Sequence, residues 1–318
     1  MNPDKPKIIV ICGPTGIGKT ELSLHLAEAF RGEVVSADSM QIYRFMEIGT
    51  AKPEPADQRR VPHFMIDVAD PDEPYDAARY AREARDCVTA IDRRGRVPFI
   101  IGGTGFYIKA LLFGLFAARP ASPEIRAQLR EEARVKGSHQ LYERLAACDP
   151  EAVQRIHPND TYRVIRALEV YALTGRPMSA CQQTHGFSDA PFDALKLCLN
   201  IERQALYGRI NQRVEQMMAQ GLLEEVRELL KMGYSGDLKS MQSIGYRHMV
   251  DYIQGRATWI DAVDQMKRDT RRYAKRQLIW FKKDPDVTWM APDDFRGARA
   301  RIEKFLDASV SGLPAGPE

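Results

Sequence analysis

A glycine-rich segment with one lysine and one threonine follows an apolar run at residues 8–12. In the spacing GxxxxGK[ST], glycines let the backbone N–H groups point inward around phosphate oxygens, Lys19 reaches the outer phosphates, and the Thr20 hydroxyl can hold a magnesium ion. Residues 21–30 have helical spacing, and a helix N-terminus favours negative charge. The segment predicts a phosphate-binding loop without indicating whether the phosphates belong to a nucleotide. Its residues are Gly13, Pro14, Thr15, Gly16, Ile17, Gly18, Lys19 and Thr20.

A carboxylate ends the next apolar run, at residues 33–38. Open α/β sheets bind ligands at the carboxyl ends of their strands, so we expect Asp38 at the same sheet edge as the phosphate-binding loop. There it can take a proton from an attacking nucleophile or hold a metal ion through water. A helix N-cap would have the same appearance in the sequence. The residues alone leave both the catalytic and the structural interpretation of Asp38 open.

A second glycine cluster, at residues 102–105, ends the apolar run at residues 97–101. The Thr104 hydroxyl either faces the reacting centre or caps the helix that follows a tight turn. Because Gly102 follows the apolar run, the usual magnesium-binding strand that ends in an acid is missing, and the guanine-reading sequence NKxD is absent. We therefore do not expect an ordinary motor protein or GTPase.

Residues 267–283 carry eight basic side chains and one acid, Asp269. On a helix, five of the basic residues lie along one face, beside a more apolar face with Tyr273 and Trp280. A run of charge is usually only a solvated face, but this run lacks the interspersed acids of such a face. It indicates contact with the phosphate backbone of a nucleic acid. The five residues, called the basic stripe below, are Arg268, Arg271, Arg272, Lys275 and Arg276.

The composition is that of an ordinary globular protein with one large core and a smaller module. The 318 residues are 44% hydrophobic and 28% charged, and a net charge of +3 is too small to indicate a polyanionic partner by itself. Five scattered cysteines, without CxxC pairs or histidines at metal-binding spacing, are typical of free thiols in a reducing cytosol. The run at residues 8–12 is too short for a signal peptide or a membrane span. We expect a soluble cytoplasmic protein with no membrane partner.

Strand and helix patterns alternate up to about residue 116, which predicts a parallel sheet flanked by helices. Two prolines at 120 and 123 break this alternation, and only helices are predicted from there to about residue 186. Asn159 or Asp160 is expected to cap one of these helices, which ends at Gly175. The predicted strands are 7–12, 33–38, 63–68, 97–102 and 196–201, and the predicted helices outside the module's first half are 19–30, 76–94, 105–115, 161–174, 203–220, 222–231, 240–254 and 259–283.

These elements predict an α/β fold, with a P-loop NTPase-like parallel sheet flanked by helices and an inserted all-helical module. The expected P-loop catalytic core comprises residues 1–120 and 195–290, and the helical insertion comprises residues 121–194. Residues 291–318 are expected to form a C-terminal helix and a disordered tail rich in proline and glycine.

Seven sequence blocks together resemble the tRNA dimethylallyltransferases of bacterial type. The longest are SADSMQIYRFMEIGTAKP at 36–53, VPFIIGGTGFYIKALLFGL at 97–115 and RIHPNDTYRVIRALEVY at 155–171; the others are GPTGIGKT, PHFMIDV, SIGYR and AKRQLIWF. The resemblance runs over most of the chain. It implies transfer of a dimethylallyl group from dimethylallyl diphosphate to N6 of the adenine 3′-adjacent to the anticodon of tRNAs, giving N6-(dimethylallyl)adenosine and diphosphate.

The resemblance also implies roles for residues. The loop binds a lipid diphosphate in place of ATP, with Mg²⁺ near Thr20 stabilising charge on the leaving group. Asp38 accepts the proton of the adenine amine, and Thr104 contacts the reacting groups. The anticodon arm of tRNA contacts the helical insertion and the core, and the protein is expected to be a monomer. The residues implied in tRNA binding are Asp38, Ser39, Met40, Gln41, Thr104, Arg126, Tyr162, Arg163, Arg166, Gln242, Gly245, Tyr246, Arg247, Lys275, Arg276, Gln277, Trp280 and Lys282.

Two other classes of protein remain as alternatives on the residues alone. A small-molecule or nucleoside kinase would use Asp38 as base and the helical insertion as a lid, with Arg163 and Arg166 on the transferred phosphoryl group. That interpretation gives no role to the basic stripe. A non-catalytic RNA-binding ATPase would need an adenine-binding or water-activating signature, which we do not find in the sequence.

Overall fold

The computed structural model describes residues 5–115, 122–185 and 189–308. Contacts within the chain divide it into two compact units, a core unit of Met1–Leu112 and Pro191–Glu318 and a helical unit of Phe113–Ala190. The helical unit begins and ends earlier in the chain than the insertion expected at 121–194. The tail expected to be disordered lies, from residue 309 on, outside the described residues.

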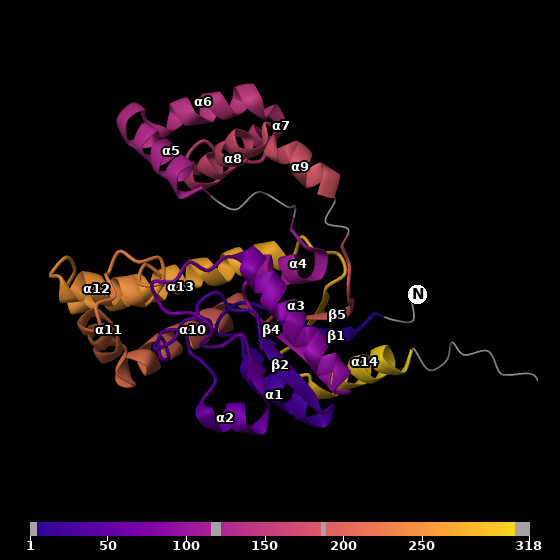
Figure 1. The fold of residues 1–318 in the computed structure, drawn as a ribbon. Coiled ribbons are helices and arrows are strands. Elements are labelled where there is room, and N and C mark those ends of the chain that lie inside the picture. The colour runs from indigo at the N-terminus through magenta and orange to yellow at the C-terminus, as the bar shows by residue number, and fades with distance from the viewer. Residues whose placement is uncertain (1–4, 116–121, 186–188, 309–318) are drawn as a thin grey trace, which may run out of the picture. The chain divides into compact units, whose positions relative to one another are not determined.

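The described residues of the core unit form a six-stranded parallel sheet in the order β3-β2-β4-β1-β5-β6 (Figure 1). The central strands are continuous apolar runs because helices cover both faces of the sheet. The predicted α/β class with a parallel sheet is confirmed. The bounds of the strands are β1 (Lys7–Cys12), β2 (Gly32–Ser36), β3 (His63–Phe64), β4 (Val97–Gly102), β5 (Asp193–Leu199) and β6 (Thr288–Met290).

The strand order places two early helices on opposite faces of the sheet. The chain moves outward from β1 to β2 and then to the edge strand β3, and it returns to β4, which lies between β2 and β1. Because parallel crossovers are right-handed, the helix of the outward step and the helix of the return step cover opposite faces. These helices are α1 (Lys19–Ala29) and α3 (Ala77–Arg93). On the face of α1, Ile9 and Ile11 of β1 share a buried cluster with Ile302 of α14 (Phe295–Asp307).

The other helices of the core unit supply much of the wall of the site described below. Figure 1 shows α10 to α13 gathered on one side of the sheet. No helix among the described residues is both long and apolar enough to cross a bilayer. The bounds of these helices are α2 (Pro55–Arg60), α4 (Gly105–Phe113), α10 (Arg203–Ala219), α11 (Leu222–Lys231), α12 (Tyr246–Ile253) and α13 (Trp259–Phe281).

The helical unit has its own core, made by the apolar faces of its helices. Leu129, Leu141 and Leu168 are buried there at 3% exposure or less. The side chain of Asp160 caps α8 by accepting a hydrogen bond from the N–H of Arg163, as one of the two expected caps. The helices are α5 (Pro123–Lys136), α6 (Ser138–Cys148), α7 (Pro150–Val153), α8 (Thr161–Thr174) and α9 (Met178–His185).

The strand predicted at 63–68 is wrong beyond Phe64. Met65 and Asp67 have φ angles of +63° and +55°, which a strand does not accommodate. The N–H of Asp67 instead donates to the carbonyl of Gln41 at 3.2 Å, so this segment forms a loop against the residues that follow Asp38.

The helix predicted at 240–254 begins only at Tyr246. The residue before it, Gly245, has a φ of +97°, which interrupts a helical backbone, and residues 236–245 form turns and bends. The structure departs from the predicted set in other ways too: β2 and β5 end before residues 38 and 201, and α2 and β6 were not predicted.

Candidate active site

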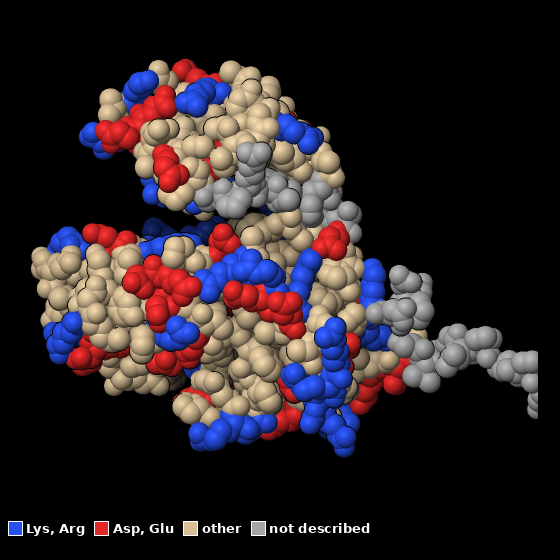
Figure 2. Space-filling view, in the orientation of Figure 1, with Lys and Arg blue, Asp and Glu red and all other residues tan. Residues whose placement is uncertain are grey.

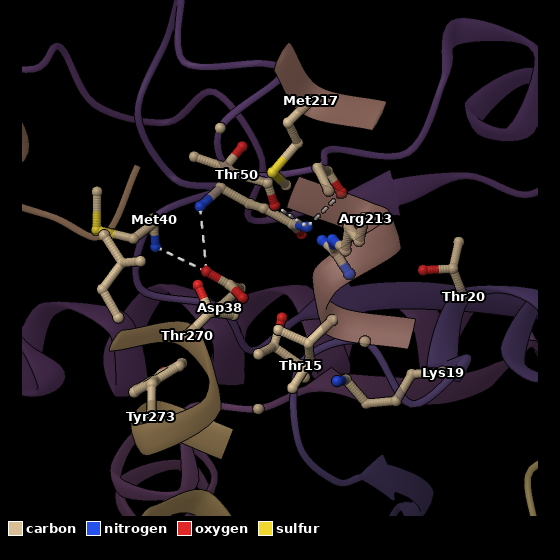
Figure 3. A pocket seen from close by; sticks show the side chains of 18 of the residues that line it. Thr15, Lys19, Thr20, Asp38, Met40, Thr50, Arg213, Met217, Thr270 and Tyr273 are labelled. Carbon is tan, nitrogen blue, oxygen red and sulfur yellow. Dashed lines mark hydrogen bonds between the residues drawn. The ribbon is translucent and has the colours of Figure 1, made fainter. Parts of the chain in front are cut away.

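A pocket of about 620 Å³ opens in the core unit at the carboxyl ends of β2 and β4 and beside the loop that follows β1. Side chains of α10 and α13 and of the segment before α12 complete its wall (Figure 3). The predicted site residues that line it are Thr15, Gly16, Ile17, Gly18, Lys19, Thr20, Asp38, Ser39, Met40, Gln41, Gln242, Tyr246, Arg247 and Gln277.

The phosphate-binding loop has the backbone that its glycines predict. Gly13, Gly16 and Gly18 have φ angles of +147°, +77° and +100°, in the region where a β-carbon causes strain. The Nζ of Lys19 donates to the carbonyl oxygens of Gly13 at 3.1 Å and Pro14 at 2.8 Å. The lysine therefore folds over its own loop and brings its charge to the pocket.

The charge of Lys19 is poorly solvated. Burial, followed by repulsion from Arg213, lowers the pKa of Lys19 to about 8, while Asp38 acts in the opposite direction. Figure 3 shows Lys19 and Arg213 reaching into the same part of the pocket. A bound anion would raise the pKa of Lys19 again, because an adjacent negative charge favours the ammonium form. This end of the pocket is suited to an anion.

Asp38 lies two residues beyond the end of β2, where its side chain is half-buried in the pocket. Its Oδ1 accepts hydrogen bonds from the N–H groups of Met40 at 2.8 Å and Gln41 at 3.4 Å. Its Oδ2 accepts none from the residues that the structure describes. The carboxylate thus caps a turn with one oxygen and leaves the other for the pocket, so the structural and catalytic interpretations are compatible.

Thr104 holds the residue that follows Asp38. Its hydroxyl accepts a hydrogen bond from the N–H of Ser39 at 3.0 Å and lies 3.4 Å from the Ser39 hydroxyl. Thr104 does not belong to the wall of the pocket. In this structure the Thr104 hydroxyl connects the turn after β4 to the turn after β2.

Gln277, buried on α13, connects the two glycine-rich loops. Its Oε1 accepts from the N–H of Thr15 at 2.9 Å, and its Nε2 donates to the carbonyl of Gly103 at 2.9 Å. A β-carbon on Gly103 would lie 2.2 Å from Nε2, so only glycine permits this approach. Both polar atoms of Gln277 are engaged within the protein, which gives this residue, implied in tRNA binding by resemblance, a bracing role.

The sequence analysis missed two arginines of α10 in the pocket wall, Arg209 and Arg213. Arg209 donates to the carbonyl of Ile17 at 3.2 Å. Burial lowers the pKa of Arg213, and among the described residues none accepts a hydrogen bond from it. Their spacing of four places both on one helix face, but no sequence pattern connects that face with a loop about 190 residues earlier.

The other end of the pocket combines apolar side chains with a tyrosine. Met217 and Met40 lie near Asp38 and Arg213 in Figure 3, and Tyr273 lies on the other side of Asp38. Burial raises the pKa of Tyr273 to about 12, so its hydroxyl stays protonated at neutral pH. The apolar residues in the wall include Val34, Met40, Val214, Met217, Ile244 and Met266.

Several predicted residues lie outside the pocket in the core unit. Gly13, Pro14 and Gly245 shape the backbone beside it, whereas Lys275, Arg276, Trp280 and Lys282 are exposed on or just after α13. In the basic stripe, Arg271 donates to Asn211 and Arg272 to Asp269, and Arg276 lies 5.7 Å from the Tyr273 ring. Arg268 and Lys275 have no ion pair within the described part of the chain. On the face of the core unit seen in Figure 2, by contrast, basic and acidic side chains are intermixed.

Four predicted tRNA-binding residues lie in the helical unit. Arg126 and Arg166 both pair with Glu169, at 2.8 Å and 2.6 Å, and the Glu169 side chain is fully buried. Tyr162 is 68% exposed, and the side chain of Arg163 is 64% exposed at 3.4 Å from Asp160. Arg126 and Arg166 therefore stabilise this unit, and Tyr162 and Arg163 are the exposed members of the set.

The donor set suits a magnesium ion that arrives with phosphates. Among the described residues, no group of three or more His, Cys, Asp or Glu side chains could hold a metal by itself. The Thr20 hydroxyl lines the pocket, and Mg²⁺ commonly takes one or two protein oxygens together with water and substrate phosphate. The residues present fit that mode of binding.

The fold is a parallel sheet with a phosphate-binding loop. One pocket beside that loop contains two cationic side chains, suited to an anion, and a carboxylate. These features define a P-loop protein that handles a phosphate ester. Sequence models of IPP transferase and of isopentenyl transferase match residues 41–284 and 6–69. The chain therefore belongs to the IPP transferase family, and the resemblance inferred from the sequence is confirmed.

Relatives match over nearly the whole chain. A tRNA dimethylallyltransferase of Desulfosudis oleivorans is 56% identical over 91% of this chain and 92% of its own length, and one of Desulfatibacillum aliphaticivorans is 54% identical over 96% and 100%. The full-length tRNA isopentenylpyrophosphate transferase of Bacillus halodurans is 40% identical with a TM-score of 0.71, covering 96% of this chain and 97% of its own. A eukaryotic dimethylallyltransferase acting on tRNA is 28% identical with a TM-score of 0.80, covering 98% and 81%.

Proposed function

We propose that this protein transfers the dimethylallyl group of dimethylallyl diphosphate to N6 of the adenine 3′-adjacent to the anticodon of tRNAs. The observation that carries the proposal is one pocket in which the anion-binding Lys19 and Arg213 lie beside the free oxygen of Asp38. Family membership supports the choice of donor and acceptor. We further propose that the protein acts as a monomer in the cytoplasm.

The diphosphate of the donor binds to the loop after β1. Breaking the allylic carbon–oxygen bond leaves negative charge on the diphosphate, and fixed donors stabilise that charge without reorganising. The backbone N–H groups of residues 16–20, Lys19 and Arg213 are these donors. A magnesium ion, held by the Thr20 hydroxyl and the diphosphate, supplies further neutralising charge when bound.

Asp38 receives the proton of the acceptor. The N6 amine of adenine is a poor nucleophile because its lone pair is conjugated with the ring. As the bond between N6 and the allylic carbon forms, a proton leaves N6 for Oδ2 of Asp38, and diphosphate departs with the electron pair of the broken bond. Met40, Met217 and Val214 contact the hydrocarbon and exclude water that would compete with the amine.

The acceptor adenine reaches this pocket by leaving the stacked anticodon loop, at a cost on the order of a few kcal/mol. Contacts to the tRNA backbone offset that cost. The basic stripe is suited to them, because within the described residues only Arg272 of its five members has an ion pair, with Asp269.

Replacing Arg268 and Lys275 together with alanine is expected to weaken tRNA binding and to reduce the slope of log affinity against log salt by about 1–2, since each phosphate contact contributes about 0.7–0.9. The matched control is the double replacement of Arg299 and Lys304 on α14, which removes the same charge. Filter binding over a range of salt measures both. An unchanged slope in the first variant would show that the stripe is a solvated face.

The choice of donor separates this proposal from a kinase. The purified protein is incubated with Mg²⁺, unmodified tRNA and either dimethylallyl diphosphate or ATP, and the nucleosides are then analysed by mass. A dimethylallyl increment on adenosine with the first donor alone is the expected result. ATP consumption without that increment would replace the proposal with nucleotide chemistry.

A further inference from the structure

The side chain of Glu225, on α11, accepts hydrogen bonds from a turn about 180 residues earlier in the chain. Its Oε2 accepts from the N–H groups of Glu47 at 3.0 Å and Ile48 at 2.7 Å, and its Oε1 accepts from that of Gly49 at 3.2 Å. The hydroxyl of Tyr246 also donates to Oε1, at 2.6 Å. The carboxylate therefore receives four hydrogen bonds and binds residues 47–49 as an anion binds a nest of backbone N–H groups.

This turn belongs to a segment that forms one wall of the pocket. Met40, Gln41, Gly49 and Thr50 all line the pocket, whereas Glu225 does not. Gly49 packs so closely on Tyr246 that a β-carbon there would lie 2.4 Å from the ring. Glu225 thus contacts the wall from outside and can act on the reaction only through it.

The same segment is bound to Asp38 at its other end. The N–H groups of Met40 and Gln41 donate to Oδ1 of Asp38, which fixes the direction of Oδ2. The amide of Gln41 donates to the carbonyl of Ala51 at 3.1 Å, so the beginning and the end of the segment are tied together. A shift of the turn at residues 47–49 would therefore be passed on to the carboxylate of Asp38.

We propose that Glu225 is a positioning residue for the transfer reaction: by holding residues 47–49 it fixes the pocket wall and the orientation of Asp38. The inference rests on the proposed function. It does not concern the donor, since the diphosphate end of the pocket is built from residues 15–20 and α10, with which Glu225 has no hydrogen bond or ion pair among the described residues.

A carboxylate is required because all four partners are donors. An ionised glutamate accepts with both oxygens. A glutamine would turn its amide N–H₂ either toward the N–H groups of residues 47 and 48 or toward the N–H of Gly49 and the hydroxyl of Tyr246. Glu225→Gln therefore keeps the size of the side chain, but its amide N–H₂ then faces other hydrogen-bond donors. The wall moves, although the helix that carries residue 225 is unchanged.

The test compares Glu225→Gln with Glu228→Gln. Glu228 lies on the same helix, 64% exposed in an ion pair with Lys231, so its replacement removes the same charge away from the pocket. For each variant, kcat and KM for tRNA are measured at saturating donor, together with the Kd for dimethylallyl diphosphate without tRNA and the melting temperature. We expect Glu225→Gln to lower kcat about 10- to 100-fold, as a misplacement near 1 Å can. Its donor Kd is expected to stay within about twofold of wild type.

Two outcomes would overturn the inference. Either Glu225→Gln turns over as fast as Glu228→Gln, or it loses donor affinity and melting temperature in step with kcat, which would show a merely structural role. Glu225→Asp, which keeps the charge but shortens the reach, provides a second variant if the glutamine variant does not fold, and it is expected to give an intermediate kcat. Wild-type protein without prenylation activity would overturn the proposed function, which is a separate result.

Discussion

Replacing Asp38 with asparagine is expected to lower kcat by about 10²- to 10⁴-fold, the usual contribution of a positioned general base. The amide keeps an oxygen that can accept from the N–H groups of Met40 and Gln41, so the turn after β2 is preserved. What it loses is the basicity that takes the proton from N6. Binding of dimethylallyl diphosphate and of tRNA is therefore expected to stay near wild type.

Single-turnover kinetics with bound tRNA and donor measure this effect without interference from product release. The control is Asp70→Asn, which removes a carboxylate that is paired with Arg44 at the surface, and whose kcat is expected to stay within about twofold of wild type. A rate for Asp38→Asn within a few-fold of wild type would remove Asp38 from the proton transfer.

Lys19→Met is expected to lower kcat/KM for dimethylallyl diphosphate by about 10²- to 10³-fold, because it removes a fixed cation from the leaving group. The pKa of Lys19 near 8 also gives wild-type donor binding a pH dependence. Below pH 8 the ammonium is present and affinity is flat. As the pH rises through about 8 the free protein loses this proton, which the bound diphosphate requires, and affinity falls by up to about tenfold per pH unit.

Calorimetric titration of dimethylallyl diphosphate between pH 7 and 9.5 measures the effect, together with proton uptake on binding. In Lys19→Met the fall above pH 8 is expected to disappear. Lys231→Met, which removes an exposed lysine of α11, serves as the control and is expected to retain the wild-type profile. A wild-type affinity that does not change above pH 8 would contradict the assigned state of Lys19.

The sequence predicts well those features that depend on local pattern. The phosphate-binding loop, the α/β class and the position of Asp38 at the edge of the sheet follow from glycine spacing, apolar runs and the geometry of parallel strands. The glycine cluster at residues 102–105 also indicates a close approach at Gly103, but the sequence does not indicate that Gln277 is the residue that approaches it. Local rules suffice here because each feature lies within one strand–loop–helix unit.

Features that depend on tertiary contacts cannot be predicted from such local patterns. Arg213, Gln277 and Glu225 act on segments about 180–260 residues earlier, and nothing in the pattern of their helices indicates which loop they meet. The resemblance implies a tRNA contact for Gln277, whereas in the structure its buried amide bonds Thr15 and Gly103.

The errors at residues 63–68 and 240–254 have a common cause. Apolar content at 63–68 and 240–254 resembles a strand and a helix, but positive φ angles at Met65, Asp67 and Gly245 interrupt both. Burial against the segment after Asp38 and against α13 decides these backbones, and it overrides the local preference.

The most direct test of the central claim concerns the acceptor. Two tRNA transcripts are prepared that differ only in the base 3′-adjacent to the anticodon, adenine in one and hypoxanthine, which lacks the exocyclic amine, in the other. With dimethylallyl diphosphate and Mg²⁺, the account predicts N6-(dimethylallyl)adenosine at that position and one diphosphate released per tRNA in the first, and neither in the second. Modification at another position, or equal diphosphate release from both transcripts, would contradict it.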